Sequence, residues 1–315
     1  MSKDNRDVLL DVQHLCVDFG SRRRPFHAVT DVSFQIYQGE TFGLVGESGS
    51  GKTTIGRSII RITPTAGGDI FYKGEHINGK ISRELDRQLT KKIQMIFQDP
   101  MASLNERAKV DYIVSEGLYA GGLKISEAER RAKVDQALTD VGLLPEFASR
   151  FPHEFSGGQR QRIGIARALI LEPDFIIADE PISALDVSIQ AQVLNLMSRL
   201  QKERGLTYLF IAHDLSVMRF ICDRIAVIYK GRLMELAGGE QLFAHPFHPY
   251  TRALLSAIPM PDPISEREKK LLVYDPDCHG YTPDNPPLWE ELEPGHFVRG
   301  SRAELDGYRA QLANS

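Results

Sequence analysis

Apolar and polar positions follow two different periods along this chain. Short apolar runs bounded by polar and turn residues, typical of β-strands, occupy 9–19, 32–37, 93–97, 175–178, 207–212 and 224–229. Helix-compatible runs lie at 55–62 and 163–171, and a further one runs to Val141 from a capping box of Ser126 and Glu129. Because strands alternate with helices, we predict an α/β fold whose sheet is interrupted by a helical insert at about 110–150.

The pattern changes after His245. Ten of the seventeen prolines lie from Pro246 onward, and apolar periodicity nearly vanishes beyond Leu272. Proline and turn residues at this density favour loops over regular elements. We therefore predict a first domain over 1–245, with its helical part at about 100–160, and a loop-rich C-terminal extension over 246–315.

Composition narrows the class of protein. The 315 residues are 42% hydrophobic and 25% charged, as in globular proteins with a substantial core, and the net charge of −4 disfavours a nucleic-acid partner. The three cysteines are far apart, which excludes a disulfide framework and fits a reducing compartment. The charged start, 1–11, is unlike a signal peptide, and no apolar window reaches 18 residues. We expect a cytoplasmic protein that reaches a membrane only through partners.

A glycine-rich segment after the apolar run 41–45 carries the most specific chemistry. A strand, a glycine-rich loop and a helix in succession are the context of a phosphate-binding loop. The alternative is a plain glycine-rich turn, which does not require a strand before it and a helix after it. In such a loop Lys52 reaches the β- and γ-phosphates and the Thr53 hydroxyl binds Mg2+. The residues expected at the nucleotide are Gly46, Glu47, Ser48, Gly49, Ser50, Gly51, Lys52, Thr53 and Thr54. We predict that the chain binds a nucleoside triphosphate.

Two adjacent acids, Asp179 and Glu180, end the apolar run 175–178. Successive side chains of a strand point to opposite faces, so Asp179 can face Mg2+ while Glu180 faces the attacking water. The alternative is that both acids are simply exposed, but two carboxylates ending a buried strand are costly without a cation or a function.

A second candidate anion site precedes that strand. Ser156 is a good N-cap for the helical run that follows, and Gly157 and Gly158 expose backbone N–H groups at its positive end. Alone, this pattern would indicate only a capped helix.

Together these residues resemble the nucleotide-binding subunits of ATP-binding cassette (ABC) transporters, over about 8–245. The resemblance implies a P-loop NTPase fold with a RecA-like core, an antiparallel β subdomain and a helical insert. Its further motifs are the glutamine loop at Gln98, the signature segment at Phe155, Ser156, Gly157, Gly158 and Gln159, the D-loop ending at Asp186, the switch histidine His213 and the adenine-stacking ring of Phe19.

The resemblance also implies how these sites work. Two cassettes meet head to tail, and each ATP lies between the phosphate loop of one and the signature helix of the other. Lys52, Glu180 and His213 form the catalytic set, since Glu180 polarises the water and His213 holds the γ-phosphate. Thr53, Gln98 and Asp179 are the expected metal-site residues, and Gln98 couples the site to a membrane subunit.

Two further segments resemble importer ATPases for oligopeptides, dipeptides and nickel. These are 99–105 and the His-Pro-Tyr-Thr run at 248–251, and the stretch 294–305 is most similar to the OppF-type subunits of oligopeptide permeases. The resemblance implies an ATPase that drives oligopeptide import with ATP and Mg2+. The implied partners are a second ABC ATPase, making a heterodimer, two membrane-spanning permease subunits and, indirectly, an extracellular peptide-binding protein. It implies a peripheral place at the cytoplasmic face of the membrane.

Alternatives remain open at this point. Many of these ATPases hold an iron–sulfur cluster in the extension, but Cys278 is its only cysteine here, so we expect no such cluster. A mixed metal site of His245, His248, Cys278 and His279 is the less favoured alternative to a packing role. A nickel or dipeptide importer is the nearest rival function. A soluble ABC ATPase is disfavoured by the negative charge and the short insert, and a degenerate cassette by the presence of Glu180 and His213.

Overall fold

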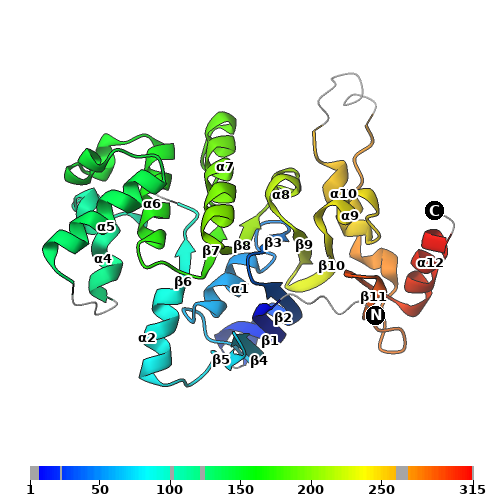
Figure 1. The fold of residues 1–315 in the computed structure, drawn as a ribbon. Coiled ribbons are helices and arrows are strands. Elements are labelled where there is room, and N and C mark those ends of the chain that lie inside the picture. The colour runs from blue at the N-terminus through cyan, green and yellow to red at the C-terminus, as the bar shows by residue number, and fades with distance from the viewer. Residues whose placement is uncertain (1–6, 22, 100–102, 121–124, 260–268, 314–315) are drawn as a thin grey trace.

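The computed structural model describes residues 7–21, 23–99, 103–120, 125–259 and 269–313, which form two sheets and flanking helices (Figure 1). The larger sheet has eight strands in the order β11-β12-β10-β9-β3-β8-β7-β6, and the smaller has four in the order β2-β1-β4-β5. In the described part of the chain, no helix combines the length and apolarity needed to cross a membrane.

The centre of the large sheet is parallel. Its five parallel strands are β6 (Ile93–Ile96), β7 (Phe175–Asp179), β8 (Thr207–Ala212), β3 (Thr41–Val45) and β9 (Arg224–Tyr229). Every residue of β3, β7 and β8 is buried, as expected for strands covered on both faces. The apolar runs predicted as strands at 93–97, 175–178, 207–212 and 224–229 are confirmed to within one residue.

The small antiparallel sheet packs on one side of this core. It comprises β1 (Val8–Ser21), β2 (Arg24–Tyr37), β4 (Gly67–Tyr72) and β5 (Glu75–His76). Phe34 of β2 stacks on Phe42 of β3 with ring centroids 5.1 Å apart, which joins the two sheets into one core. Helix α1 (Lys52–Ile59) contributes Ile55 and Ile59 to the same core, and α2 (Arg83–Lys92) precedes β6.

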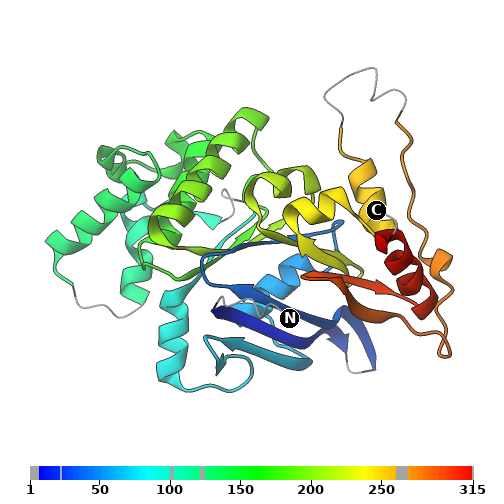
Figure 2. The ribbon, with the colours of Figure 1, turned by 45° about the vertical axis from the view of Figure 1, so that its right-hand side comes forward.

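Helices form the opposite end of the molecule from the C-terminal extension (Figures 1 and 2). They are α4 (Val110–Ala120), α5 (Glu127–Asp140), the short 3-10 turns η1 (Pro145–Ser149) and η2 (Pro152–Glu154), and α6 (Gly157–Leu169). The predicted capping box of Ser126 and Glu129 is confirmed at the start of α5. Two further helices, α7 (Val187–Arg204) and α8 (Leu215–Ile221), follow β7 and β8.

The C-terminal extension differs from the loop-rich prediction. After β10 (Arg232–Gly238), α9 (Gly239–Ala244) and α10 (Pro249–Ser256), the chain forms η3 (Pro276–His279), β11 (Leu288–Glu293), β12 (His296–Gly300) and α12 (Arg302–Ala313). Strand β12 pairs antiparallel with β10, so the extension continues the large sheet. These strands are stabilised by that pairing and by a small core of Phe247, Val298, Leu305 and Tyr308. The sequence of β11 did not predict a strand, because three of its six residues are glutamates and no apolar alternation is visible.

Glu235 fastens the extension to β10. Its side chain is 0% exposed, and its carboxylate accepts the backbone N–H groups of Phe247 (2.8 Å) and His248 (3.0 Å). The same carboxylate lies 2.7 Å from Nε2 of the equally buried His296 on β12. One buried acid therefore satisfies donors from both halves of the extension.

Replacing Glu235 by alanine is expected to lower the free energy of unfolding by about 3–5 kcal/mol, because two buried amides and the buried His296 ring lose the acceptor that they share. Urea denaturation of the full chain measures this. Glu240→Ala is the matched control, since that exposed glutamate lies 3.4 Å from Arg219 at the surface, and the denaturation midpoint should not move. Equal midpoints for the two variants would contradict the role of Glu235.

Candidate active site

The carboxyl ends of four neighbouring strands bring the predicted residues together. The loop 46–51 follows β3, His213 follows β8, Asp179 and Glu180 end or follow β7, and Gln98 follows β6 closely. The strands run parallel in the order β3-β8-β7-β6, with Val45 opposite Ala212 and Asp179 opposite Ile211. Parallel sheets bind ligands at the carboxyl ends of their strands. The order of the strands therefore brings these residues together.

The loop after β3 has the backbone of an anion cradle. Gly51 has a φ of 102°, which a residue with a side chain rarely adopts, and α1 begins immediately after it without a side-chain cap. A Cβ at Gly46 would lie 2.1 Å from the carbonyl oxygen of Ile228, so only glycine fits there. The N-terminal N–H groups of α1 are left to face an anion instead of a capping side chain.

Lys52 is held inside this loop. Its ammonium donates to the carbonyl oxygens of Gly46 (2.7 Å) and Glu47 (2.8 Å), and the residue is 4% exposed. Burial lowers the pKa of Lys52, against the opposing influence of the Glu180 and Asp179 carboxylates. A buried ammonium whose hydrogen bonds go to backbone carbonyl oxygens is suited to binding phosphate oxygens.

Thr53 and Asp179 meet as a pair of oxygen ligands. The Thr53 hydroxyl donates to Oδ1 of Asp179 at 2.8 Å, and Asp179 is 2% exposed. Burial raises the pKa of the Asp179 carboxyl, although the Thr53 hydrogen bond opposes that shift. A divalent cation would offset this cost, and a hydroxyl and a carboxylate are ligands that Mg2+ accepts. The residues present therefore fit a magnesium ion.

Glu180 stands between Gln98 and His213. Its Oε2 accepts the Gln98 amide at 2.7 Å and lies 3.4 Å from Nδ1 of His213. Glu180 also has a φ of 46°, in the left-handed region that residues other than glycine rarely occupy. The backbone N–H of Glu180, which donates to the Ile211 carbonyl oxygen at 2.9 Å, helps to hold this conformation. Such strain is found where function requires a fixed side-chain direction.

Lys52, Thr53, Gln98, Glu180 and His213 face one pocket of about 560 Å³, and Asp179 lines an adjoining one that Gln98 also lines. Its lining residues are Phe19, Phe26, Ala28, Ser48, Gly49, Gly51, Lys52, Thr53, Thr54, Gln98, Glu180 and His213. Of the predicted phosphate-loop residues, Gly46, Glu47 and Ser50 are not among those that line it. Phe26 and Ala28 were missed from the sequence, because the second strand was expected to begin only at Val32, whereas β2 begins at Arg24.

Phe26 stands beside Phe19 at the mouth of the pocket. The two residues are partners across β1 and β2, and their exposed fractions of 64% and 44% are high for phenylalanine. Side chains opposite each other in an antiparallel pair lie on the same face of the sheet. Exposed paired rings beside a phosphate site are suited to stacking on a nucleobase.

Phe26→Ala is expected to weaken ATP binding about fivefold, by removing a ring contact of roughly 1 kcal/mol. Binding of inorganic triphosphate, which has no base, should not change. Calorimetric titration of both ligands measures this, with Val8→Ala on the same sheet as the control, because Val8 is exposed but does not line this pocket. A loss for both ligands would mean that Phe26 supports the phosphate loop and not the base.

The predicted signature segment lies outside this pocket. Ser156 caps α6 through a capping box with Gln159, and Ser156, Gly157 and Asp186 are exposed. A Cβ at Gly158 would lie 2.5 Å from Cγ2 of Ile189, so glycine lets α6 approach α7 closely. The structure therefore separates Ser156, Gly157, Gly158, Gln159 and Asp186 from the phosphate loop of the same chain. Part of the other predicted segment, 99–105, falls at 100–102, outside the described residues.

The histidines of the extension have protein partners. The two ring nitrogens of His279 contact the Tyr274 hydroxyl (3.0 Å) and the Glu304 carboxylate (2.6 Å), and Nδ1 of His248 accepts the Tyr250 N–H. Over the described residues, no three His, Cys, Asp or Glu side chains are grouped to hold a metal ion. These contacts give His248 and His279 structural roles.

The site defines a nucleotide-hydrolysing cassette of the ABC type. It combines a phosphate loop, a Thr–Asp pair suited to magnesium, and a glutamate between a glutamine and a histidine, all at the carboxyl ends of strands in this order. The ABC transporter family model matches residues 29–183, and the model of the oligopeptide/dipeptide transporter C-terminal region matches 234–278. The oligopeptide transport ATP-binding protein AmiF of Streptococcus pneumoniae is 62% identical over 97% of this chain and 99% of its own length. OppF of Bacillus subtilis, which has the same descriptive name, is 55% identical over 96% and 99%.

Solved structures agree with this assignment. The cbiO1 protein of Clostridium perfringens, part of the ABC transporter complex cbiONQ, aligns with a TM-score of 0.67 and 31% identity over 76% of this chain and 91% of its own. The cassette MJ0796, in a dimeric post-hydrolysis state with ADP and phosphate, aligns with a TM-score of 0.66 and 28% identity over 73% and 98%. The chain belongs to the OppF/AmiF family of ABC transporter ATP-binding proteins, and it is an ATPase.

Proposed function

We propose that this chain is the motor subunit of an oligopeptide importer, in which ATP hydrolysis drives peptide translocation through separate membrane subunits. The observation that carries the hydrolytic part is the Glu180 carboxylate, fixed between Gln98 and His213 at the pocket that holds Lys52. The cargo is proposed from the match to the oligopeptide/dipeptide C-terminal region and from relatives named for oligopeptide transport over nearly the full chain.

Each side chain has a role that its position supports. Lys52 would exchange its bonds with the Gly46 and Glu47 carbonyls for bonds with the β- and γ-phosphates of ATP. Glu180 would accept hydrogen bonding from the attacking water and polarise it, and His213 would hold the γ-phosphate. When bound at Thr53, Asp179 and Gln98, Mg2+ supplies positive charge that neutralises the triphosphate. Phe19 and Phe26 would contact the adenine.

The exposed signature segment supports a paired arrangement. Ser156, Gly157, Gly158, Gln159 and Asp186 would complete the ATP site of a second cassette, since they lie outside the pocket of their own chain. That second cassette is proposed to be a related ATPase in a heterodimer. The capped start of α6 then presents its N–H groups and positive dipole end to the partner's nucleotide.

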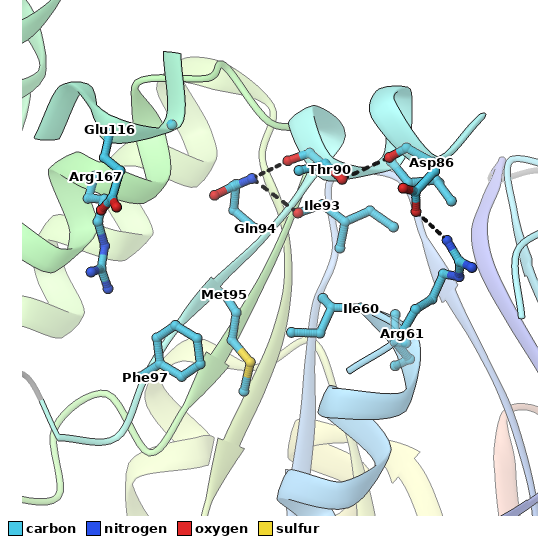
Figure 3. A pocket seen from close by; sticks show the side chains of 13 residues that line it. Ile60, Arg61, Asp86, Thr90, Ile93, Gln94, Met95, Phe97, Glu116 and Arg167 are labelled. Atoms are coloured by element: carbon cyan, nitrogen blue, oxygen red, sulfur yellow. Dashed lines mark hydrogen bonds and ion pairs between the residues drawn. The ribbon is translucent and has the colours of Figure 1, made fainter. Parts of the chain in front are cut away.

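A groove beside the site fits a membrane subunit (Figure 3). It has a volume of about 350 Å³ and lies between the end of α1, α2, β6 and the helices α4 and α6. Its apolar wall includes Ile60, Met95 and Phe97, and Arg61, Glu116 and Arg167 supply charges around it. Phe97 directly precedes Gln98, so a short permease helix in this groove would be coupled to Glu180 through the Gln98 hydrogen bond. We propose that this docking occurs at the cytoplasmic face of the membrane, in a complex with two permease subunits and, outside, a peptide-binding protein.

The test is uptake of labelled oligopeptides, dipeptides and nickel by cells that lack this chain, with and without its restoration. We expect oligopeptide uptake to be lost and then restored, with nickel uptake unchanged. Loss of dipeptide or nickel uptake alone would support the role as a transport ATPase and would show that the cargo is dipeptides or nickel and not oligopeptides. If no uptake changed while the restored protein was present, the importer assignment would be wrong and a soluble ABC ATPase would take its place.

A further inference from the structure

A tyrosine of the C-terminal extension contacts the phosphate loop directly. The backbone N–H of Glu47, the second residue of the loop, donates to the hydroxyl oxygen of Tyr250 at 3.1 Å. Tyr250 belongs to α10 and is 1% exposed, and burial raises the pKa of its hydroxyl to about 12, so the group stays neutral. The two residues are separated by 203 positions in the chain, and the contact therefore exists only because the extension folds back onto the core.

The position of Tyr250 is fixed by the start of its own helix. His248 is the N-cap of α10, and its Nδ1 accepts the Tyr250 N–H at 3.1 Å. Burial lowers the pKa of His248 to about 3, so the ring is neutral and its nitrogen can accept. The backbone N–H of His248 in turn donates to the buried carboxylate of Glu235. An unbroken series of buried contacts thus runs from β10 to the Tyr250 side chain.

The ring of Tyr250 packs where the large sheet meets the phosphate loop. Its centroid lies 4.7 Å from that of Tyr229, the last residue of β9, and 5.2 Å from that of Tyr274. The turn after Tyr229 reaches the loop as well, because the Gly231 N–H donates to the Ser50 carbonyl at 3.0 Å. The loop is therefore held at two places, Glu47 and Ser50, by segments outside it.

The peptide group between Gly46 and Glu47 is held from both sides. Its carbonyl oxygen, on Gly46, accepts the Lys52 ammonium at 2.7 Å, and its N–H, on Glu47, donates to Tyr250. A peptide group is planar, so fixing the direction of the N–H also fixes the direction of the carbonyl. The Tyr250 hydroxyl therefore helps to fix the direction of one of the two carbonyl groups to which Lys52 donates.

We propose that Tyr250 is a positioning residue of the ATP site, which holds the Gly46–Glu47 peptide so that the phosphate loop and Lys52 are arranged for the triphosphate. The proposal rests on the nucleotide site proposed above. It gives the extension a function in ATP binding beyond packing: the segment 248–251 makes the affinity for nucleotide dependent on the folded extension.

The test compares Tyr250→Phe with the wild type in the full-length chain. Calorimetric titration with Mg2+ and a non-hydrolysable ATP analogue should show affinity about fivefold weaker, the effect of losing one hydrogen bond. Adenosine, which has no phosphate, should bind equally well to both proteins. Tyr229→Phe is the matched control, because it removes a hydroxyl from the adjoining ring, and among the described residues that hydroxyl makes no hydrogen bond to the phosphate loop. It should bind the analogue as the wild type does.

Hydrogen exchange resolved to single amides gives an independent readout. In the wild type the Glu47 amide should be protected, and in Tyr250→Phe its exchange should rise while the amides of β7 stay protected. Unchanged affinity in Tyr250→Phe, or a Glu47 amide in the wild type that exchanges as fast as an exposed loop amide, would overturn the proposal. The exchange rate of the Glu47 amide in the wild type needs no variant, so it tests the proposal even if Tyr250→Phe fails to fold. Failure of the wild type to bind the analogue, or normal binding by Lys52→Ala, would instead show that the nucleotide site itself is wrongly assigned.

Discussion

Glu180→Gln is expected to lower ATP turnover by about 10²–10⁴-fold while leaving ATP binding intact, because the amide keeps the shape of the side chain and loses its ability to act as a base. Gln98 and His213 would still hold the side chain in place, since both can reorient toward an amide. The measurement is steady-state hydrolysis by the assembled transporter, together with equilibrium binding of ATP. Binding without turnover should hold the two cassettes closed, and this state should appear as a stable dimer by size-exclusion chromatography.

The control for this variant is the same substitution at Glu172. That residue also has a positive φ, of 53°, but lies before β7 and forms an exposed pair with Lys133. Glu172→Gln should turn over ATP like the wild type. If Glu180→Gln did so as well, and kept its turnover when the partner cassette was also inactivated, Glu180 would have no role as the base.

Lys52→Ala is expected to weaken ATP binding by about 30-fold to more than 1,000-fold, because the phosphates lose a buried cation that no other lysine replaces in the described pocket. Hydrolysis and peptide uptake should fall with it. The measurement is calorimetric titration with Mg2+ and a non-hydrolysable ATP analogue, and circular dichroism checks that the fold is kept. Lys80→Ala, which removes an exposed lysine, should bind normally. Normal affinity in Lys52→Ala would remove this lysine from the site.

The central site was predictable because its chemistry is local. Glycines, Lys52 and Thr53 are consecutive, and Asp179 and Glu180 directly end an apolar run, so each motif shows both its residues and its supporting strand. Strands β3, β8, β7 and β6 are parallel neighbours, so their carboxyl ends bring these motifs together at one end of the sheet.

What escaped prediction depends on pairing between distant segments. β10 was missed because Glu235 interrupts an otherwise apolar run, and its buried position becomes intelligible only with His296 and the amides of Phe247 and His248 in place. β4 was missed because it opens with two glycines and is a strand by virtue of pairing with β1. Tyr250 was noticed only as part of a family segment, since one hydroxyl that contacts Glu47 from 203 residues away leaves no local pattern.

The pairing of β12 with β10 also determines how this sheet ends. Without β12, strand β10 would present a row of unpaired N–H and C=O groups, which is a template for strands from other molecules. With the extension in place, the sheet ends at β11, which carries Glu290, Glu291 and Glu293. Glu290 pairs with Arg302 and Arg309, and Glu293 lies 3.2 Å from Nδ1 of His296. The extension therefore covers the open side of β10 and leaves as the border a short strand with charged side chains, which is how natural sheets limit pairing with other molecules.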